Sequence, residues 1–139
     1  MNHYNYEDLE IGHEESFDYE ITNEKMEAFL MITNDTNPLH NDLEYAKGKG
    51  YSEKVVYGML TSSALSTLAG VYLPGEKSLI HSVEISFVSP VFVSNSPLKV
   101  VGKVIEKDDR FRQITIKYSI TDKNGTKVSR GKMKIGVLE

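Results

Sequence analysis

The feature that most constrains the fold is one apolar helical pattern, from Gly58 to Tyr72, ahead of a long alternating region. Leu60, Ala64 and Leu68 recur every four residues, which is the spacing of one helix face. The Pro-Gly pair that follows predicts the end of this helix. Because its residues are small and apolar, we expect the helix to be buried on most of its circumference.

Most of the chain after this helix alternates between apolar and polar residues, with the period of two that is typical of half-buried strands. The clearest case is Arg112 to Ile120, where every second residue is Ile or Tyr. Asp122–Gly125 reads as a hairpin turn, because its Asn-Gly pair suits positive φ. The segments predicted as strands are Ser16–Ile21, Leu79–Val88, Leu98–Glu106, Arg112–Ile120 and Thr126–Val137.

A second, shorter helix is predicted from Asn23 to Ile32, with Thr22 or Asn23 as its cap. A sheet with one apolar face must cover that face, and only the helix from Gly58 is apolar and long enough to do so. The sequence therefore predicts one α+β domain over residues 1–139, with an antiparallel sheet of about five strands wrapped around a central helix. Such a sheet leaves uncovered edges, so we expect a homodimer.

Composition narrows the classes of function. The chain has 139 residues and a net charge of −4 without a basic block, which argues against nucleic acid as a partner. It has no cysteine, which excludes disulfides and thiol nucleophiles. The four histidines lack metal-ligand spacing, so neither a metal nor a redox cofactor is expected. With a polar, acidic start and no long apolar run, the expectation is a cytoplasmic protein that does not enter membranes.

Chemistry is indicated most clearly by the segment Thr33–Asp42, TNDTNPLHND, where a carboxylate and an imidazole stand five positions apart. Pro38 disfavours helical geometry in the residue before it, so this segment is predicted to be a non-helical turn. Such a turn can direct Asp35 and His40 toward one point, where they could hold a water molecule and exchange protons with it. The same spacing also occurs by chance, and Asn37 between them could simply cap the turn.

A second signal is the start of the apolar helix at Gly58. The first backbone N–H groups of a helix have no partner inside the helix, and glycine lets a ligand approach them closely. Gly58 is therefore a candidate oxyanion hole for a carbonyl oxygen that gains negative charge. Its alternative role is a tight turn before the helix.

Together these motifs resemble the MaoC-like dehydratases, a family that includes the (R)-specific enoyl-CoA hydratases. The family signature is close to Ser-Gly-Asp-x-Asn-Pro-Leu/Ile-His, later followed by His-Gly-Met-Leu. Here it reads Thr33-Asn34-Asp35-Thr36-Asn37-Pro38-Leu39-His40 and Tyr57-Gly58-Met59-Leu60. The resemblance continues at Tyr45-Ala46, Leu73-Pro74-Gly75 and Phe87-Val88-Ser89-Pro90-Val91, and extends from about Phe17 to the end of the chain.

Three positions depart from the family pattern. Asn34 replaces a glycine, although asparagine tolerates left-handed backbone better than most residues, so the turn can survive. Tyr57 replaces the usual histidine before Gly-Met-Leu. Ser94-Asn95 replaces a Gly-Asp pair. None of these departures changes the catalytic candidates themselves.

The resemblance implies a hotdog-fold homodimer that acts on acyl thioesters, carried by CoA or by an acyl carrier. It implies that Asp35 and His40 hold the catalytic water and that the Gly58 N–H binds the thioester carbonyl. Asn37 and Ser66 are then candidates for substrate binding, although Ser66 could equally bond its own helix backbone. The expected reaction interconverts 2-enoyl and (R)-3-hydroxyacyl thioesters, without cofactor or metal.

Two other functions fit the same resemblance. A hotdog thioesterase shares the substrate class and cleaves the thioester. A non-catalytic acyl-binding subunit would keep the fold alone, which the presence of both Asp35 and His40 disfavours.

Overall fold

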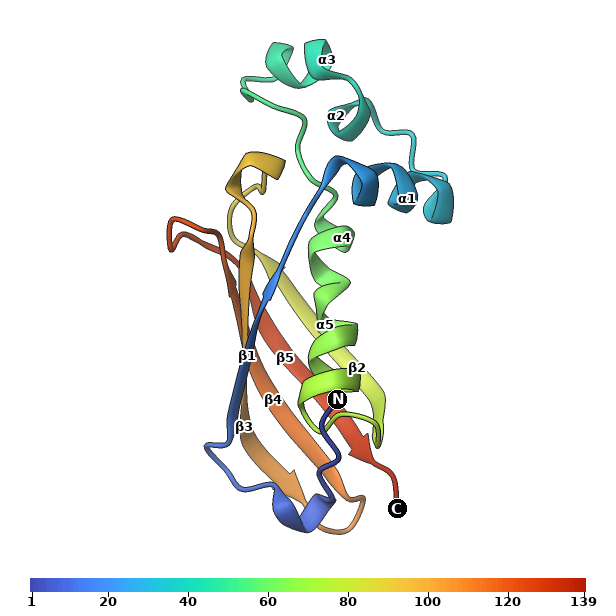
Figure 1. The fold of residues 1–139 in the computed structure, drawn as a ribbon, viewed down its shortest axis with the longest axis vertical. Coiled ribbons are helices and arrows are strands. Elements are labelled where there is room, and N and C mark those ends of the chain that lie inside the picture. The colour runs from blue at the N-terminus through green and yellow to red at the C-terminus, as the bar shows by residue number, and fades with distance from the viewer.

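The computed structural model describes all residues 1–139 and contains one sheet with a helix along one of its faces (Figure 1). The five strands are β1 (Glu14–Tyr19), β2 (Ser78–Phe87), β3 (Leu98–Asp108), β4 (Gln113–Thr121) and β5 (Lys127–Val137). Their spatial order is β1-β3-β4-β5-β2, and every neighbouring pair is antiparallel. All predicted strands are confirmed within about two residues.

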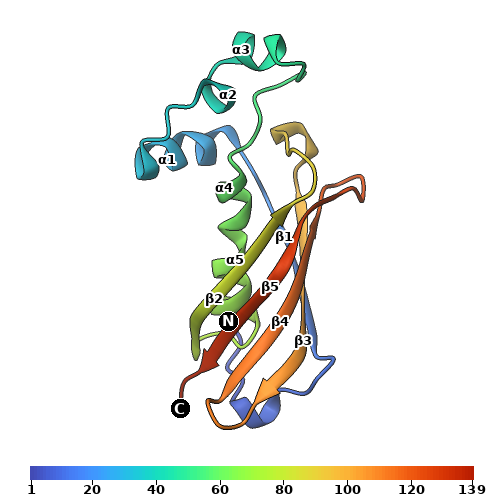
Figure 2. The same cartoon turned by 180° about the vertical axis from the view of Figure 1, so that it is seen from behind.

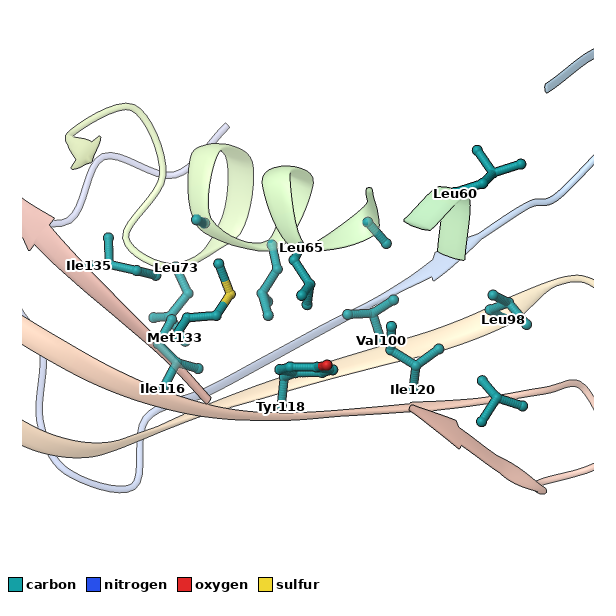
Figure 3. Packing of buried hydrophobic residues seen from close by; sticks show 14 of the residues in the cluster. Leu60, Leu65, Leu73, Leu98, Val100, Ile116, Tyr118, Ile120, Met133 and Ile135 are labelled. Atoms are coloured by element: carbon teal, nitrogen blue, oxygen red, sulfur yellow. The ribbon is translucent and has the colours of Figure 1, made fainter. Parts of the chain in front are cut away.

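The central helix is one run of three consecutive elements, which are α4 (Gly58–Ser62), α5 (Ala64–Thr67) and the π-helical turn η2 (Leu68–Tyr72). Its apolar side packs against the concave face of the sheet, where side chains from β3, β4 and β5 meet it (Figure 3). Leu65 and Leu68 are at most 3% exposed. The predicted sheet wrapped around a helix is thus confirmed, and burial of this face supplies the main driving force for folding.

The central helix is buried on most of its circumference, as expected, because the residues between Gly58 and Tyr72 are buried or half-buried at all but two positions. The two exceptions are Met59, which is 58% exposed, and Ser66, and they mark a narrow open side of the helix at the surface of the single chain. The open side contains a methionine, serines and a glycine, whereas the leucines of the helix are all buried.

Three further helices gather beyond the start of α4, at one end of the molecule (Figures 1 and 2). They are α1 (Asn23–Thr33), α2 (Pro38–Asn41) and α3 (Leu43–Gly48). Thr22 caps α1 by accepting a hydrogen bond from the N–H of Lys25 at 3.1 Å, as predicted. Two short 3₁₀ turns, η1 (Tyr6–Asp8) and η3 (Val93–Asn95), complete the chain.

Two local predictions need correction. The segment after Thr33 was expected to be non-helical, yet Pro38 begins the short helix α2. A proline is well tolerated at the first helical position, since its missing N–H has no partner there in any case. In the hairpin turn only Gly125 has positive φ (83°); Asp122 stabilises the turn instead, by accepting hydrogen bonds from the N–H groups of Asn124 and Thr126.

No helix of this structure combines the length and the apolar character that a membrane span requires.

Candidate active site

Asp35, His40 and Gly58 line one cavity between α1, the loop that follows it and the start of α4. The cavity has a volume of about 580 Å³. The other lining residues are Phe29, Thr33, Tyr57, Met59 and Phe87. The structure therefore brings together residues that are 23 positions apart in the chain, as the two sequence motifs suggested.

A tight backbone turn places Asp35 at the cavity. Asn34 ends α1 in the left-handed conformation, with φ 57° and ψ 27°, and its N–H donates to the carbonyl of Leu30. This confirms that asparagine fills the place of the family's glycine, because it tolerates this geometry. One oxygen of the Asp35 carboxylate accepts a hydrogen bond from the N–H of Asn37 at 3.1 Å, and the other makes no hydrogen bond within the chain.

A backbone carbonyl fixes the orientation of His40. The Nδ1 atom lies 2.6 Å from the carbonyl oxygen of Val55. A carbonyl can only accept, so Nδ1 carries the proton and the Nε2 atom of the neutral ring has a free lone pair. His40 makes no other hydrogen bond through its side chain, which leaves Nε2 available to a water molecule or a substrate.

Gly58 presents an unused donor. Neither the Gly58 N–H nor the Met59 N–H donates to a group of the chain, whereas the N–H of Leu60 bonds the carbonyl of Tyr57 at 3.0 Å. A Cβ added to Gly58 would lie 2.9 Å from Cε1 of Phe87, so a side chain at this position would crowd the approach to the N–H. The free donors carry the partial positive charge of a helix start, which favours an oxygen that gains negative charge.

A second cavity of about 270 Å³ meets the first at His40, Gly58 and Phe87. Its lining is largely apolar and includes the buried residues Val55, Val56, Val91 and Val128. A substrate centred on the shared residues can therefore extend in two directions.

The two candidates for substrate binding, Asn37 and Ser66, line neither of these cavities. The Asn37 side chain accepts a hydrogen bond from the N–H of Leu39 at 3.0 Å, which is the capping role considered as its alternative. Ser66 is exposed on the open side of the central helix and lines neither cavity.

Sequence reasoning missed three contributors. The Val55 carbonyl that orients His40 is a backbone group, which no residue pattern identifies. Phe87 lies in a predicted strand and in a stretch that resembles the family, but the sequence did not mark it as a site residue, and Asn41 was not singled out. The side-chain amide of Asn41 donates to the carbonyl oxygens of Asp35 and Asn37, at 3.3 and 3.2 Å.

Comparisons with known proteins show what the chain as a whole is similar to. A family model described as a MaoC-like domain matches residues 9–125. An (R)-specific enoyl-CoA hydratase from Aeromonas caviae is 31% identical over 102 residues, covering 73% of this chain and 76% of the relative. A mitochondrial 3-hydroxyacyl-[acyl-carrier-protein] dehydratase from Arabidopsis thaliana is 30% identical over 98 residues, covering 70% of this chain and 57% of the relative.

The same fold occurs in solved structures. The (R)-hydratase from A. caviae superposes with a TM-score of 0.87 at 27% identity, covering 93% of this chain and 97% of that one. The expected hotdog architecture is therefore confirmed. With a family match over most of its length, the chain belongs to the MaoC-like domain family.

Proposed function

We propose that this enzyme of the hydratase and dehydratase type adds water to 2-enoyl thioesters and forms (R)-3-hydroxyacyl thioesters, or catalyses the reverse reaction. The observation that carries the proposal is the meeting of Asp35, His40 and the free Gly58 N–H at one cavity. The named relatives, an enoyl-CoA hydratase and a 3-hydroxyacyl-carrier dehydratase, support the same reaction class.

The reaction assigns each group a task. Asp35 and the Nε2 atom of His40 hold a water molecule between them, and one of the two takes its proton as the oxygen bonds to C3 of the substrate. The electron pair of the C2–C3 double bond moves toward the thioester, whose oxygen gains negative charge and is stabilised by the Gly58 N–H. The group that took the proton from the water then delivers a proton to C2, which completes the addition of water and restores the group for the next turnover.

A thioesterase would use the same fold with water attacking the thioester carbon. The two reactions are separated by following an enoyl-CoA substrate in parallel with absorbance of the enoyl thioester and with a thiol reagent. Hydration removes the absorbance without releasing thiol, and cleavage releases thiol in proportion. If the absorbance does not fall and no thiol is released, the result would favour the third candidate, an acyl-binding subunit without catalysis.

We also propose that the working form is a cytoplasmic homodimer joined along β2. This strand is at the edge of the sheet and pairs only with β5. It is ten residues long and exposes Ile80, Val83 and Phe87, at 40%, 40% and 56%. The opposite edge, β1, is shorter and carries Glu14 and Asp18, which protect an edge against further pairing.

Light scattering of the purified protein is expected to give the mass of two chains. Val83→Lys places a charge on the proposed interface and is expected to shift the protein toward monomer. Ile11→Lys, which replaces a 67% exposed residue outside the sheet, is the matched control and should leave the dimer intact. A wild-type protein that is monomeric and fully active would contradict this proposal.

A further inference from the structure

We propose that Tyr57 is the positioning residue of this active site, and that it sets the place of all three groups named in the reaction. This inference rests on the proposed function and concerns the position where the chain departs from the family's histidine. Tyr57 is only 1% exposed, so its hydroxyl lies away from solvent and depends on partners within the protein. It belongs to the loop before α4, and its side chain reaches back to the loop after α1.

The hydroxyl of Tyr57 holds the backbone that carries Asp35. Its oxygen lies 3.1 Å from the carbonyl oxygen of Asp35 and 2.9 Å from Oδ1 of Asn41. The amide nitrogen of Asn41 lies between two carbonyl oxygens, which only accept, so the orientation of this side chain is fixed. The single hydroxyl proton of Tyr57 therefore serves two acceptors, and both would lose a buried donor without it.

The ring of Tyr57 supports the second group. It stacks on the His40 ring with 4.3 Å between centroids and 29° between planes. On another side it contacts Phe29 of α1, with a centroid distance of 4.8 Å. These contacts hold the imidazole against the Val55 carbonyl, so that its Nε2 atom stays directed away from that bond.

The backbone of Tyr57 places the third group. The Gly58 N–H belongs to the peptide that joins Tyr57 to Gly58, and the Tyr57 carbonyl accepts the hydrogen bonds that start α4, from Leu60 and Thr61. Movement of the ring would thus be transmitted to the oxyanion donor as well as to Asp35 and His40. Tyr57 contacts all three groups and has no step of its own in the proposed reaction. It is therefore suited to fix the distances between them.

Tyr57→Phe tests the role of the hydroxyl, because phenylalanine keeps the ring and its stacking. Loss of a buried donor is expected to lower kcat by about 10-fold, with KM changed by less than about 2-fold. Since the hydroxyl acts through Asp35, the same change made in the Asp35→Asn protein is expected to lower the residual kcat by less than about 2-fold. The residual rates are measured at high enzyme concentration.

Tyr118→Phe is the matched control. Tyr118 is also 1% exposed and its hydroxyl lies 3.0 Å from Oγ of Ser129, in the core beneath the central helix. This variant should lower the unfolding temperature as much as Tyr57→Phe does and leave kcat unchanged. If Tyr57 had only a structural effect, Tyr57→Phe would lower kcat by the same factor in the wild-type and in the Asp35→Asn protein, and that result would overturn the inference. A wild-type kcat in Tyr57→Phe would overturn it as well.

Hydrogen exchange gives a second readout that does not depend on activity. The N–H groups of Asn37 and Leu39, which bond the side chains of Asp35 and Asn37, are expected to exchange faster in Tyr57→Phe and at the wild-type rate in Tyr118→Phe. Unchanged exchange in Tyr57→Phe would refute the inference. A wild-type protein with no hydratase activity but with this exchange pattern would refute only the proposed function.

Discussion

Replacing Asp35 by Asn, or His40 by Asn, is expected to lower the turnover of enoyl-CoA hydration by on the order of 10²-fold or more, because each change removes an acid–base group. The double variant should be little worse than the poorer single variant, since both residues act on one water molecule. The measurement is the initial rate of loss of enoyl-thioester absorbance at saturating substrate.

The structure shows which of the two variants is the cleaner test. In Asp35→Asn the new side-chain oxygen can still accept the hydrogen bond from the N–H of Asn37, so the turn should survive. In His40→Asn the Val55 carbonyl loses the Nδ1–H that donates to it. Because Val55 is only 8% exposed, this loss is expected to lower the stability by about 1–3 kcal/mol. Near-wild-type rates in both single variants would disprove the assignment.

The second large effect is expected at Gly58. Gly58→Val keeps the N–H donor and crowds the path to it, because the added Cβ would meet the Phe87 ring at 2.9 Å. The atoms that this Cβ would meet belong to the far end of a side chain and not to the backbone, so unfolding should shift by only a few degrees. Losing one donor of this kind typically costs about 10²- to 10³-fold in kcat, and we expect a loss in this range.

Gly48→Val is the control for this experiment. Gly48 lies at the end of α3, and a Cβ added there meets no atom within 4 Å. It should hydrate substrate at the wild-type rate. If Gly58→Val also shows normal kinetics, the oxyanion site lies elsewhere in the protein.

Much of the fold follows from local patterns in the sequence. The alternation of Ile114, Ile116 and Ile120 predicts a strand with one buried face, and all three side chains are fully buried. The same reasoning does not locate the narrow open side of the central helix at Met59 and Ser66. Small residues such as Ser66 and Gly70 suit a buried helix as well as an exposed one, and only the placement of the sheet decides between them.

The sequence predicts the site as two separate motifs. How the two motifs are held against each other in space could not be predicted. Asp35 and His40 share a short segment whose turn residues are visible in the sequence. Two groups from later in the chain hold these residues in place. The Val55 carbonyl orients His40, and the Tyr57 hydroxyl bonds the backbone of Asp35. A backbone acceptor leaves no trace in residue types, and the reach of Tyr57 depends on a loop path that local propensity does not determine.

The most direct test of the account is the hydration of crotonyl-CoA by the purified protein, with chiral analysis of the product and Asp35→Asn measured alongside. The account predicts (R)-3-hydroxybutyryl-CoA, no release of free CoA, and a rate at least about 10²-fold lower in Asp35→Asn. Release of CoA in place of hydration, formation of the (S) product, or an Asp35→Asn rate equal to that of the wild type would contradict it.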